Sequence, residues 1–416
     1  MLLLNNSILK INTYLLILIP FLLIFGPALP DIALSLSSIL FLVYIILNKK
    51  YYILKNKFVF IFLLFYFYII FTSLISDKII LSFESSLFYI RYLFFVLCFS
   101  YLINYNENIL KFLFFSFLLT FIFLIIDSYF QYFFGYNFFG FEYDGLRLSG
   151  IFKDEKILGS FLSRMTPLFI GISIFIYGDS KFKIIFILIL ITLIDILVVL
   201  SGERTSIFYM FISTLIITIF ISKWKVYRLI AFFISVILSG IIIISNDSVK
   251  ERVLTKTFDQ TNIMGEKMNT FSIQHQVIYE TSFKIFKDHP FFGIGPKNFR
   301  EKCKQDRYKT YTKLDQSIDG CQSHPHNTYI QLLVETGLFG FFIIFFVFVY
   351  LNYLLFKHAY IFIVNKKFFI SDLNICMIVA MYVSLWPLAP TGNFFNNWLS
   401  VIYFFPLGIF LSKKNT

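Results

Sequence analysis

The sequence predicts an all-α integral membrane protein, and three observations support this fold class. Of the 416 residues, 58% are hydrophobic and 14% are charged, whereas soluble domains average about 45–50% apolar and about 25% charged residues. The mean hydropathy is +0.78. The apolar residues lie in runs of about 20, the length that a helix needs to cross a bilayer core. A soluble enzyme, a disordered chain and a small disulfide-rich secreted domain are therefore excluded.

Apolar runs follow one another along the whole chain, and we expect about twelve transmembrane helices. The first run follows Lys10 and is long, and a second run comes almost at once. We therefore expect an uncleaved anchor and not a signal peptide. The expected spans are residues 11–29, 31–48, 57–76, 86–104, 109–130, 157–178, 182–200, 204–222, 229–246, 328–356, 370–389 and 396–412.

Basic residues outnumber acidic ones by 36 to 24, which gives a net charge of +12. They gather in alternate loops, the distribution that places those loops in the cytoplasm. We therefore expect both termini to be cytoplasmic, and the charge needs no nucleic-acid partner. The basic residues of this inner set are Lys49, Lys50, Lys55, Lys57, Lys111, Lys181, Lys183, Lys223, Lys225, Arg228, Lys357, Lys366, Lys367, Lys413 and Lys414.

A few charges lie inside the expected spans, where they are costly and usually paired. Arg91 and Arg164 are the cations, and Asp127 and Asp195 are the candidate partners. Arg164 lies about two turns into its span, within reach of an outer cavity, whereas Arg91 lies nearer the middle of its own span. We expect Arg91 to be paired for structural reasons.

The spans and loops divide the chain into four expected parts. Residues 1–130 hold the first five helices, and 131–246 hold a first outer loop and helices six to nine. Residues 247–327 form a long outer loop, and 328–416 hold the last three helices. A loop as long as 247–327 usually carries function or is disordered. It contains four of the five histidines and a periodic apolar stretch near 276–287, which predicts an amphipathic helix at the membrane face.

The four cysteines divide into two pairs. Cys98 and Cys376 lie inside spans, where they are expected to act as small apolar residues. Cys303 and Cys321 flank a polar stretch of the long loop, and they can form a disulfide if that loop faces an oxidising compartment. Such a bond would stabilise the fold by about 3 kcal/mol. No Cys/His zinc spacing is present.

The densest polar cluster lies between the long loop and the tenth span. Pro325 interrupts the chain, and Thr328 with Gln331 reads as a capping box, so a helix is expected to begin at Thr328. His326 then lies just outside a helix N-terminus, which favours an anion and disfavours an imidazolium. A neutral histidine beside such an anion site is suited to act as a general base for a hydroxyl nucleophile.

Two glycines follow in the same helix. Gly337 lies eleven residues after His326, close to three turns, so we expect both on one face. Gly340 follows one turn later and allows a neighbouring helix to approach closely. Two interfacial histidines with a glycine packing face account for this spacing equally well. A metal site is a weak alternative, because His324 and His326 have no suitable third ligand nearby.

Four short motifs together resemble the O-antigen ligase family. His326-Asn327, nine residues and then Gly337-Leu-Phe-Gly340 fit the family's histidine signature. Arg147-Leu-Ser-Gly-Ile-Phe152, Ser201-Gly-Glu-Arg-Thr and Pro290-Phe-Phe-Gly-Ile-Gly295 resemble its Arg-x-x-Gly-x-Phe, Ser-x-x-Arg-[Ser/Thr] and Pro-x-x-Gly-x-Gly segments. Each motif is weak alone, but their order on one topology makes the resemblance specific.

The resemblance implies a fold like that of class C membrane glycosyltransferases, and a reaction. A glycan on undecaprenyl pyrophosphate is transferred to a sugar hydroxyl of lipid A-core during lipopolysaccharide biosynthesis, at the periplasmic face of the bacterial inner membrane. No metal and no cofactor is implied. An O-antigen polymerase, which extends another lipid-linked glycan from the same donor, stays an alternative. A solute transporter is a remote one, because its polar groups would lie near the membrane midplane of two inverted halves.

The resemblance also assigns roles to residues. His326 is the expected general base, and Arg204, at the outer end of its span, is expected to stabilise the departing pyrophosphate, since guanidinium suits bidentate phosphate contact. Weaker candidates for substrate contact are Arg147, His275, Lys297, Arg300, Asn327, Glu335 and Gly337. 

One departure from the family concerns the long loop. The family commonly has an arginine about 15 residues before the Pro-x-x-Gly-x-Gly stretch, and here the neighbourhood is Ser272-Ile-Gln-His275. Either His275, Arg300 or Arg252 is expected to do part of that work.

Overall fold

The structure, a computed structural model, describes residues 2–178, 180–261, 271–311 and 319–412. In this part of the chain the regular elements are helices, and extended pairing is limited to two isolated bridges, Tyr136 with Glu142 and Tyr311 with Asp319. Lys413 and Lys414 of the inner basic set lie outside the described residues.

Nine helical segments within the described residues are long and apolar enough to cross a membrane. Three shorter apolar helices, α9 (Arg204–Phe220), α16 (Asp372–Ser384) and α17 (Asn397–Phe410), lie where the other spans were expected. The all-α membrane class is confirmed, and the count of twelve spans stays a prediction. The nine are α1 (Leu2–Leu22), α2 (Ala28–Leu47), α3 (Lys57–Leu74), α4 with α5 (Ile79–Ser86 and Arg91–Tyr105), α6 (Asn108–Phe134), α7 (Leu158–Tyr177), α8 (Lys181–Leu200), α10 (Lys225–Ser245) and α15 (Thr328–Asn365).

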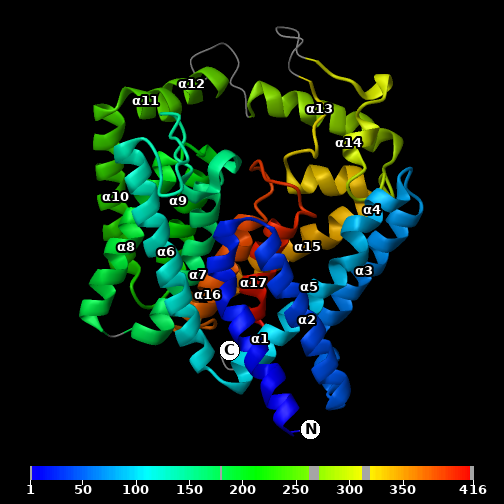
Figure 1. Cartoon of the computed structure of the whole chain (residues 1–416), viewed down its shortest axis with the longest axis horizontal. Coiled ribbons are helices and arrows are strands. Elements are labelled where there is room, and N and C mark those ends of the chain that lie inside the picture. Colours follow the sequence, from blue (N-terminus) through cyan, green and yellow to red (C-terminus); the bar gives the residue numbers. More distant parts are fainter. Residues whose placement is uncertain (1, 179, 262–270, 312–318, 413–416) are drawn as a thin grey trace.

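Helices α7, α16 and α17 form the centre of the bundle (Figure 1). Each is buried along most of its length, and α16 packs on α7, α9 and α17. Their sequences are apolar on all sides, as a helix without a lipid-facing stripe requires. The outer helices instead expose large side chains such as Phe182 and Ile244, which suits contact with lipid tails.

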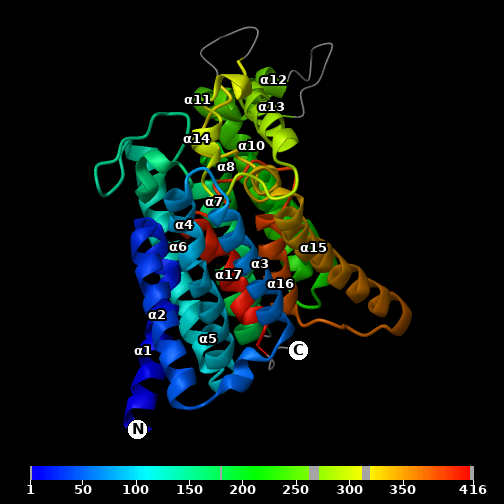
Figure 2. The same ribbon diagram turned by 90° about the vertical axis from the view of Figure 1, so that its right-hand side faces the viewer.

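Helix α1 begins and α17 ends in the same half of the bundle, opposite to α12 and α13 (Figures 1 and 2). We call the end that carries α11 (Asp247–Lys250), α12 (Lys256–Thr261), α13 (Ile273–Asp288) and α14 (Phe299–Lys302) the outer end. The amphipathic stretch expected near 276–287 lies within α13, whose apolar face is buried and packs on α15. The segment 247–327 is therefore largely folded where it is described.

The charges inside the bundle are paired differently from the expectation. Arg91 contacts Asp31 at 2.8 Å, and Asp195 forms a buried pair with Arg228 at 2.5 Å. Asp127 accepts hydrogen bonds from the side-chain amide of Asn137 and from the backbone N–H of Phe138. Neither aspartate is paired with Arg91, and Arg228, placed in the inner loop set by sequence, is buried. Long side chains near a helix end reach partners that a span boundary does not predict.

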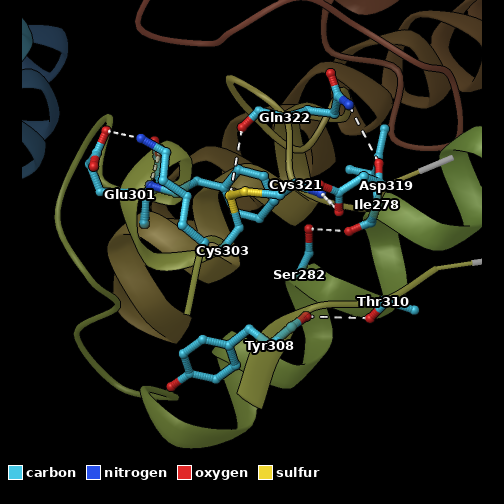
Figure 3. The surroundings of a disulfide bond; sticks show 12 residues. Ile278, Ser282, Glu301, Cys303, Tyr308, Thr310, Asp319, Cys321 and Gln322 are labelled. Carbon is cyan, nitrogen blue, oxygen red and sulfur yellow. Dashed lines mark hydrogen bonds and ion pairs between the residues drawn. A yellow bond between two sulfur atoms is a disulfide. The ribbon is translucent and has the colours of Figure 1, made fainter. Parts of the chain in front are cut away.

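Cys303 and Cys321 are joined by a disulfide, with their Cα atoms 5.1 Å apart. Figure 3 shows the bond beside Ile278 and Ser282 of α13. It connects the end of α14 to the segment that leads to His326. Cys98 and Cys376 are buried and free inside α5 and α16.

Candidate active site

His326 lies immediately before α15, on a backbone that the helix cap fixes. The Asn327 side chain accepts hydrogen bonds from the second and third N–H groups of the helix, and it donates to the Pro387 carbonyl at 2.8 Å. His326 has a positive φ of 55°, and its carbonyl accepts from the Thr391 N–H at 2.9 Å. The expected capping box is wrong by one residue: the helix begins at Thr328, but Asn327 is the cap.

Three imidazoles gather at this point. The ring of His326 lies 4.0 Å from that of His324 and 6.0 Å from that of His275, centroid to centroid. Burial lowers the pKa of His326. Burial, with the charge of His326 as a smaller cause, lowers the pKa of His275 to about 4 and that of His324 to about 3. The rings are therefore neutral at pH 7, and a neutral imidazole can accept a proton.

The first outer loop is held against the turn between α8 and α9. The Gln131 side chain, at the end of α6, accepts hydrogen bonds from the N–H groups of Ser149 and Gly150. The next backbone contact joins the Leu148 N–H to the Leu200 carbonyl at 3.2 Å. These contacts place Arg147 beside the turn that begins α9 with Arg204.

Three arginines meet there, and we call Arg147, Arg204 and Arg252 the arginine cluster. Arg252 follows α10 and donates from its Nε to the Gly202 carbonyl at 3.2 Å. Burial lowers the pKa of Arg252, and the positive charges of the other two arginines lower it further. Asp144 and Glu203 are the acidic neighbours, and the Glu203 side chain accepts from the Gly159 N–H at 2.8 Å. The cluster is a desolvated, net positive site of the kind that binds phosphate groups.

The arginine cluster and the histidines form one continuous site. The positive charge of Arg204 acts on His275, as does that of His326. His275 is thus close to both Arg204 and the expected base. The structure brings together Arg147, Arg204, His275 and His326 from the expected set, and it selects Arg252 over Arg300 as the loop arginine beside the other two. The signal for Arg252 was its position just past the outer end of a span.

Helix α15 is broken at Gly337, which has φ 65° and ψ −171°. The expectation that Gly337 lies below His326 on one continuous helical face is therefore wrong. The segment Pro290–Gly295 packs against the break, with hydrogen bonds from the Leu338 N–H to the Pro290 carbonyl at 2.9 Å and from the Gly295 N–H to the Glu335 carbonyl at 2.8 Å. A Cβ on Gly337 would lie 2.1 Å from the Phe291 carbonyl oxygen. Only glycine permits this contact.

The break is also held from α3, by a residue that sequence reasoning missed. The Tyr68 hydroxyl donates to the Thr336 carbonyl at 2.5 Å and approaches the Phe291 carbonyl at 3.2 Å. Gly340 admits this side chain, because a Cβ there would lie 3.1 Å from the Tyr68 ring. Among 26 tyrosines no sequence signal distinguishes this one.

Three expected substrate contacts are instead buried among protein groups. Asn327 caps α15, and Gly337 packs on backbone. The Glu335 carboxylate is fully buried and accepts from the Gln331 side chain at 2.8 Å and from the Phe299 N–H at 3.4 Å. It therefore holds the start of α14 against α15. We assign these three residues to positioning and not to substrate contact.

The two basic residues after Gly295 separate. Lys297 pairs with Glu84 of α4 at 3.3 Å, away from the arginine cluster. Arg300 instead lies close to His324, and its positive charge contributes to the lowered pKa of that ring. Inside the bundle, Arg164 donates to the Ser160 carbonyl and lies 4.7 Å from the centre of the Tyr209 ring.

In the described part of the chain no group of three or more His, Cys, Asp or Glu is arranged to hold a metal ion.

Comparison with known proteins identifies the domain. Residues 184–345 match the family model described as O-Antigen ligase. No curated protein matches the chain. The matched range covers the turn with Arg204, the segment 247–327 and the break in α15, so it includes three of the four motifs. Residues 184–345 of this multi-pass membrane protein are thus similar to the O-antigen ligase domain, and the resemblance drawn from the motifs is confirmed over this range.

Proposed function

We propose that this protein is an O-antigen ligase, which transfers a glycan from undecaprenyl pyrophosphate to a sugar hydroxyl of lipid A-core. The acceptor oxygen attacks the anomeric carbon, and the bond from that carbon to the phosphate oxygen breaks. The hydroxyl proton passes to His326, and the pyrophosphate leaves on its lipid. Direct displacement of this kind uses no metal and no cofactor.

The observation that carries the proposal is that His275 lies near both the neutral His326 and a cationic residue, Arg204. A base must be neutral to accept a proton, and burial lowers the pKa of His326 accordingly. A pyrophosphate leaving group needs positive charge where its own negative charge develops. Arg204, Arg147 and Arg252 supply this charge, and His275 is close to both Arg204 and His326.

The same arrangement favours a location. The loops that hold the described residues of the inner basic set lie at the end of the bundle opposite to the outer end (Figures 1 and 2), and a disulfide lies in the outer layer. Disulfides persist in oxidising compartments. We therefore place the protein in the bacterial inner membrane, with both termini in the cytoplasm and the site facing the periplasm. Labelling of Lys→Cys variants from outside the membrane tests this: Lys49→Cys should be protected in intact cells, and Lys304→Cys should react.

The decisive test is the lipopolysaccharide of a strain that lacks this protein. A ligase predicts lipid A-core without long chains, while the full-length glycan accumulates on undecaprenyl pyrophosphate. Single units on the core would instead identify the O-antigen polymerase activity. Restoring the strain with His326→Ala or Arg204→Ala should give the same defect as no protein, at normal amounts in the membrane. Near-normal lipopolysaccharide from either variant would overturn its assigned role.

A further inference from the structure

A cavity of about 760 Å³ lies at the outer end, next to His324. Four separate segments form its wall: the turn between α1 and α2, the first outer loop, the strip with Arg300 and His324, and residues 392–399 before and in α17. None of the three members of the arginine cluster lines it. His324 lines the cavity and contacts His326 at 4.0 Å between ring centres. His326 is therefore the next ring beyond the cavity wall, and the arginine cluster lies outside that wall.

The wall of the cavity combines aromatic rings with polar groups. Phe139, Phe141, Phe152 and Trp398 line it together with Ser323. Phe139 is 53% exposed, and its ring lies 6.2 Å from that of Phe141, centroid to centroid. Aromatic faces with a few placed polar groups are typical of small-molecule sites. The C–H faces of a sugar ring pack on such rings, while its hydroxyls need hydrogen-bonding groups.

The charges of the wall distinguish the cavity from the arginine cluster. Lys153 and Arg300 are balanced by Asp154 and Glu155, and Lys153 and Asp154 lie 3.8 Å apart. Burial keeps His324 neutral by lowering its pKa to about 3. The wall thus carries no net charge, whereas the three arginines of the cluster outnumber their two acidic neighbours, Asp144 and Glu203. An anionic ligand is attracted to the cluster, and an uncharged one is not excluded from the cavity.

We infer that this cavity binds the acceptor as an uncharged sugar, stacked on Phe139 and Phe141, with its reacting hydroxyl turned toward His326. The inference rests on the proposed function, because it assigns the second substrate of the same site. The donor pyrophosphate, on the arginine cluster, and the acceptor sugar, in the cavity, then occupy separate places near His326. Such a division keeps the leaving group on the cations and the nucleophile beside the base.

The test is steady-state transfer by the purified full-length protein with donor and acceptor varied separately. Phe139→Ala should raise the KM for lipid A-core about tenfold, as expected for one lost aromatic contact, and leave the donor KM within about twofold. Phe138→Ala is the matched control, since Phe138 is also 53% exposed and does not line the cavity. A raised donor KM, or equal behaviour of the two variants, would overturn the inference and leave the proposed function intact.

Two further comparisons separate the inference from the function. The first compares kcat/KM for lipid A-core whose terminal sugar is free with that for lipid A-core whose terminal sugar is phosphorylated. The free form should have the higher kcat/KM, and Glu155→Gln, which removes a negative charge from the wall, should bring the two values closer together. A preference for the phosphorylated form would overturn the inference. If the protein uses an undecaprenyl-linked glycan and not lipid A-core, the ligase proposal fails. The Phe139 and Phe138 variants are then compared on that acceptor, where the same rise in acceptor KM supports the cavity and its absence refutes it.

Discussion

Substitution of Gly337 by alanine tests whether the break in α15 is required for the fold. Gly337 has φ 65° and ψ −171°, a region that essentially only glycine adopts. An added Cβ would lie 2.1 Å from the Phe291 carbonyl oxygen and 2.6 Å from the Phe292 nitrogen. Both contacts are with backbone, so no side-chain rotation relieves them. The segment Pro290–Gly295 has to separate from α15.

The expected loss of stability follows from what the separation removes. Three backbone hydrogen bonds join the two segments, donated by Leu338, Ile294 and Gly295, at 2.9, 3.0 and 2.8 Å. Each contributes about 1 kcal/mol. Strain at the substituted residue adds about 1 kcal/mol or more. Gly337→Ala should therefore lower the free energy of unfolding by about 4 kcal/mol, which corresponds to a fall in Tm of about 5 °C for a chain of this length.

The measurement is thermal unfolding of the purified full-length protein in detergent micelles, followed by tryptophan fluorescence. Gly240→Ala in α10 is the control, since a Cβ there meets nothing within 4 Å and Gly240 has no positive φ. Alanine in an open helical position is neutral or slightly stabilising. A Gly337→Ala protein that melts with the Gly240→Ala protein and retains transfer would refute the proposed role of the break.

Three other predictions concern the base, the cations and the disulfide. Because burial lowers the pKa of His326 below its usual 6.5, the acid limb of the pH–rate profile should be centred below pH 6.5, and an acid limb centred at or above pH 6.5 contradicts this. Arg252→Gln should lower kcat/KM by about tenfold or more, because a charged contact with the substrate is lost. The control is Arg307→Gln, at an exposed ion pair outside the arginine cluster, which should leave kcat/KM unchanged. Equal kcat/KM values for the two variants would remove Arg252 from the site. Cys303→Ser should lower the free energy of unfolding by about 3 kcal/mol. Reductant should lower the Tm of the wild-type protein but not that of this variant. A wild-type Tm that does not change in reductant would argue against the bond with Cys321.

The apolar runs predicted the positions of the helices well, because each run of this length has only one stable form in a bilayer. They predicted the ion pairs poorly. Asp195 and Arg228 are 33 residues apart and pair across two helices, so no local pattern connects them. The same holds for Tyr68, which is bonded to Thr336 from 268 residues away.

The break in α15 shows why the candidate site was only partly predictable. The run 328–356 has no proline and is mostly apolar, so its pattern predicts one straight helix. The conformation of Gly337 is imposed by the segment Pro290–Gly295, which supplies hydrogen bonds for the freed backbone groups. Sequence reasoning found both segments as motifs but placed Gly337 on a substrate-facing surface. Contacts between distant segments decided the conformation of Gly337. Contacts of the same kind gave Asn327 and Glu335 positioning roles in place of substrate contact.

The four motifs form two structural pairs, and this pairing explains their composition. Residues 147–152 dock on the turn 201–206 through the Leu148 to Leu200 hydrogen bond, and this pair places two of the three arginines. The segment 290–295 docks on the break at Gly337, and this second pair supports α15 and its cap beside His326. The glycines permit close backbone contact within each pair. A change at a glycine should therefore weaken transfer through the position of the cations or the base, without removing any group that touches substrate.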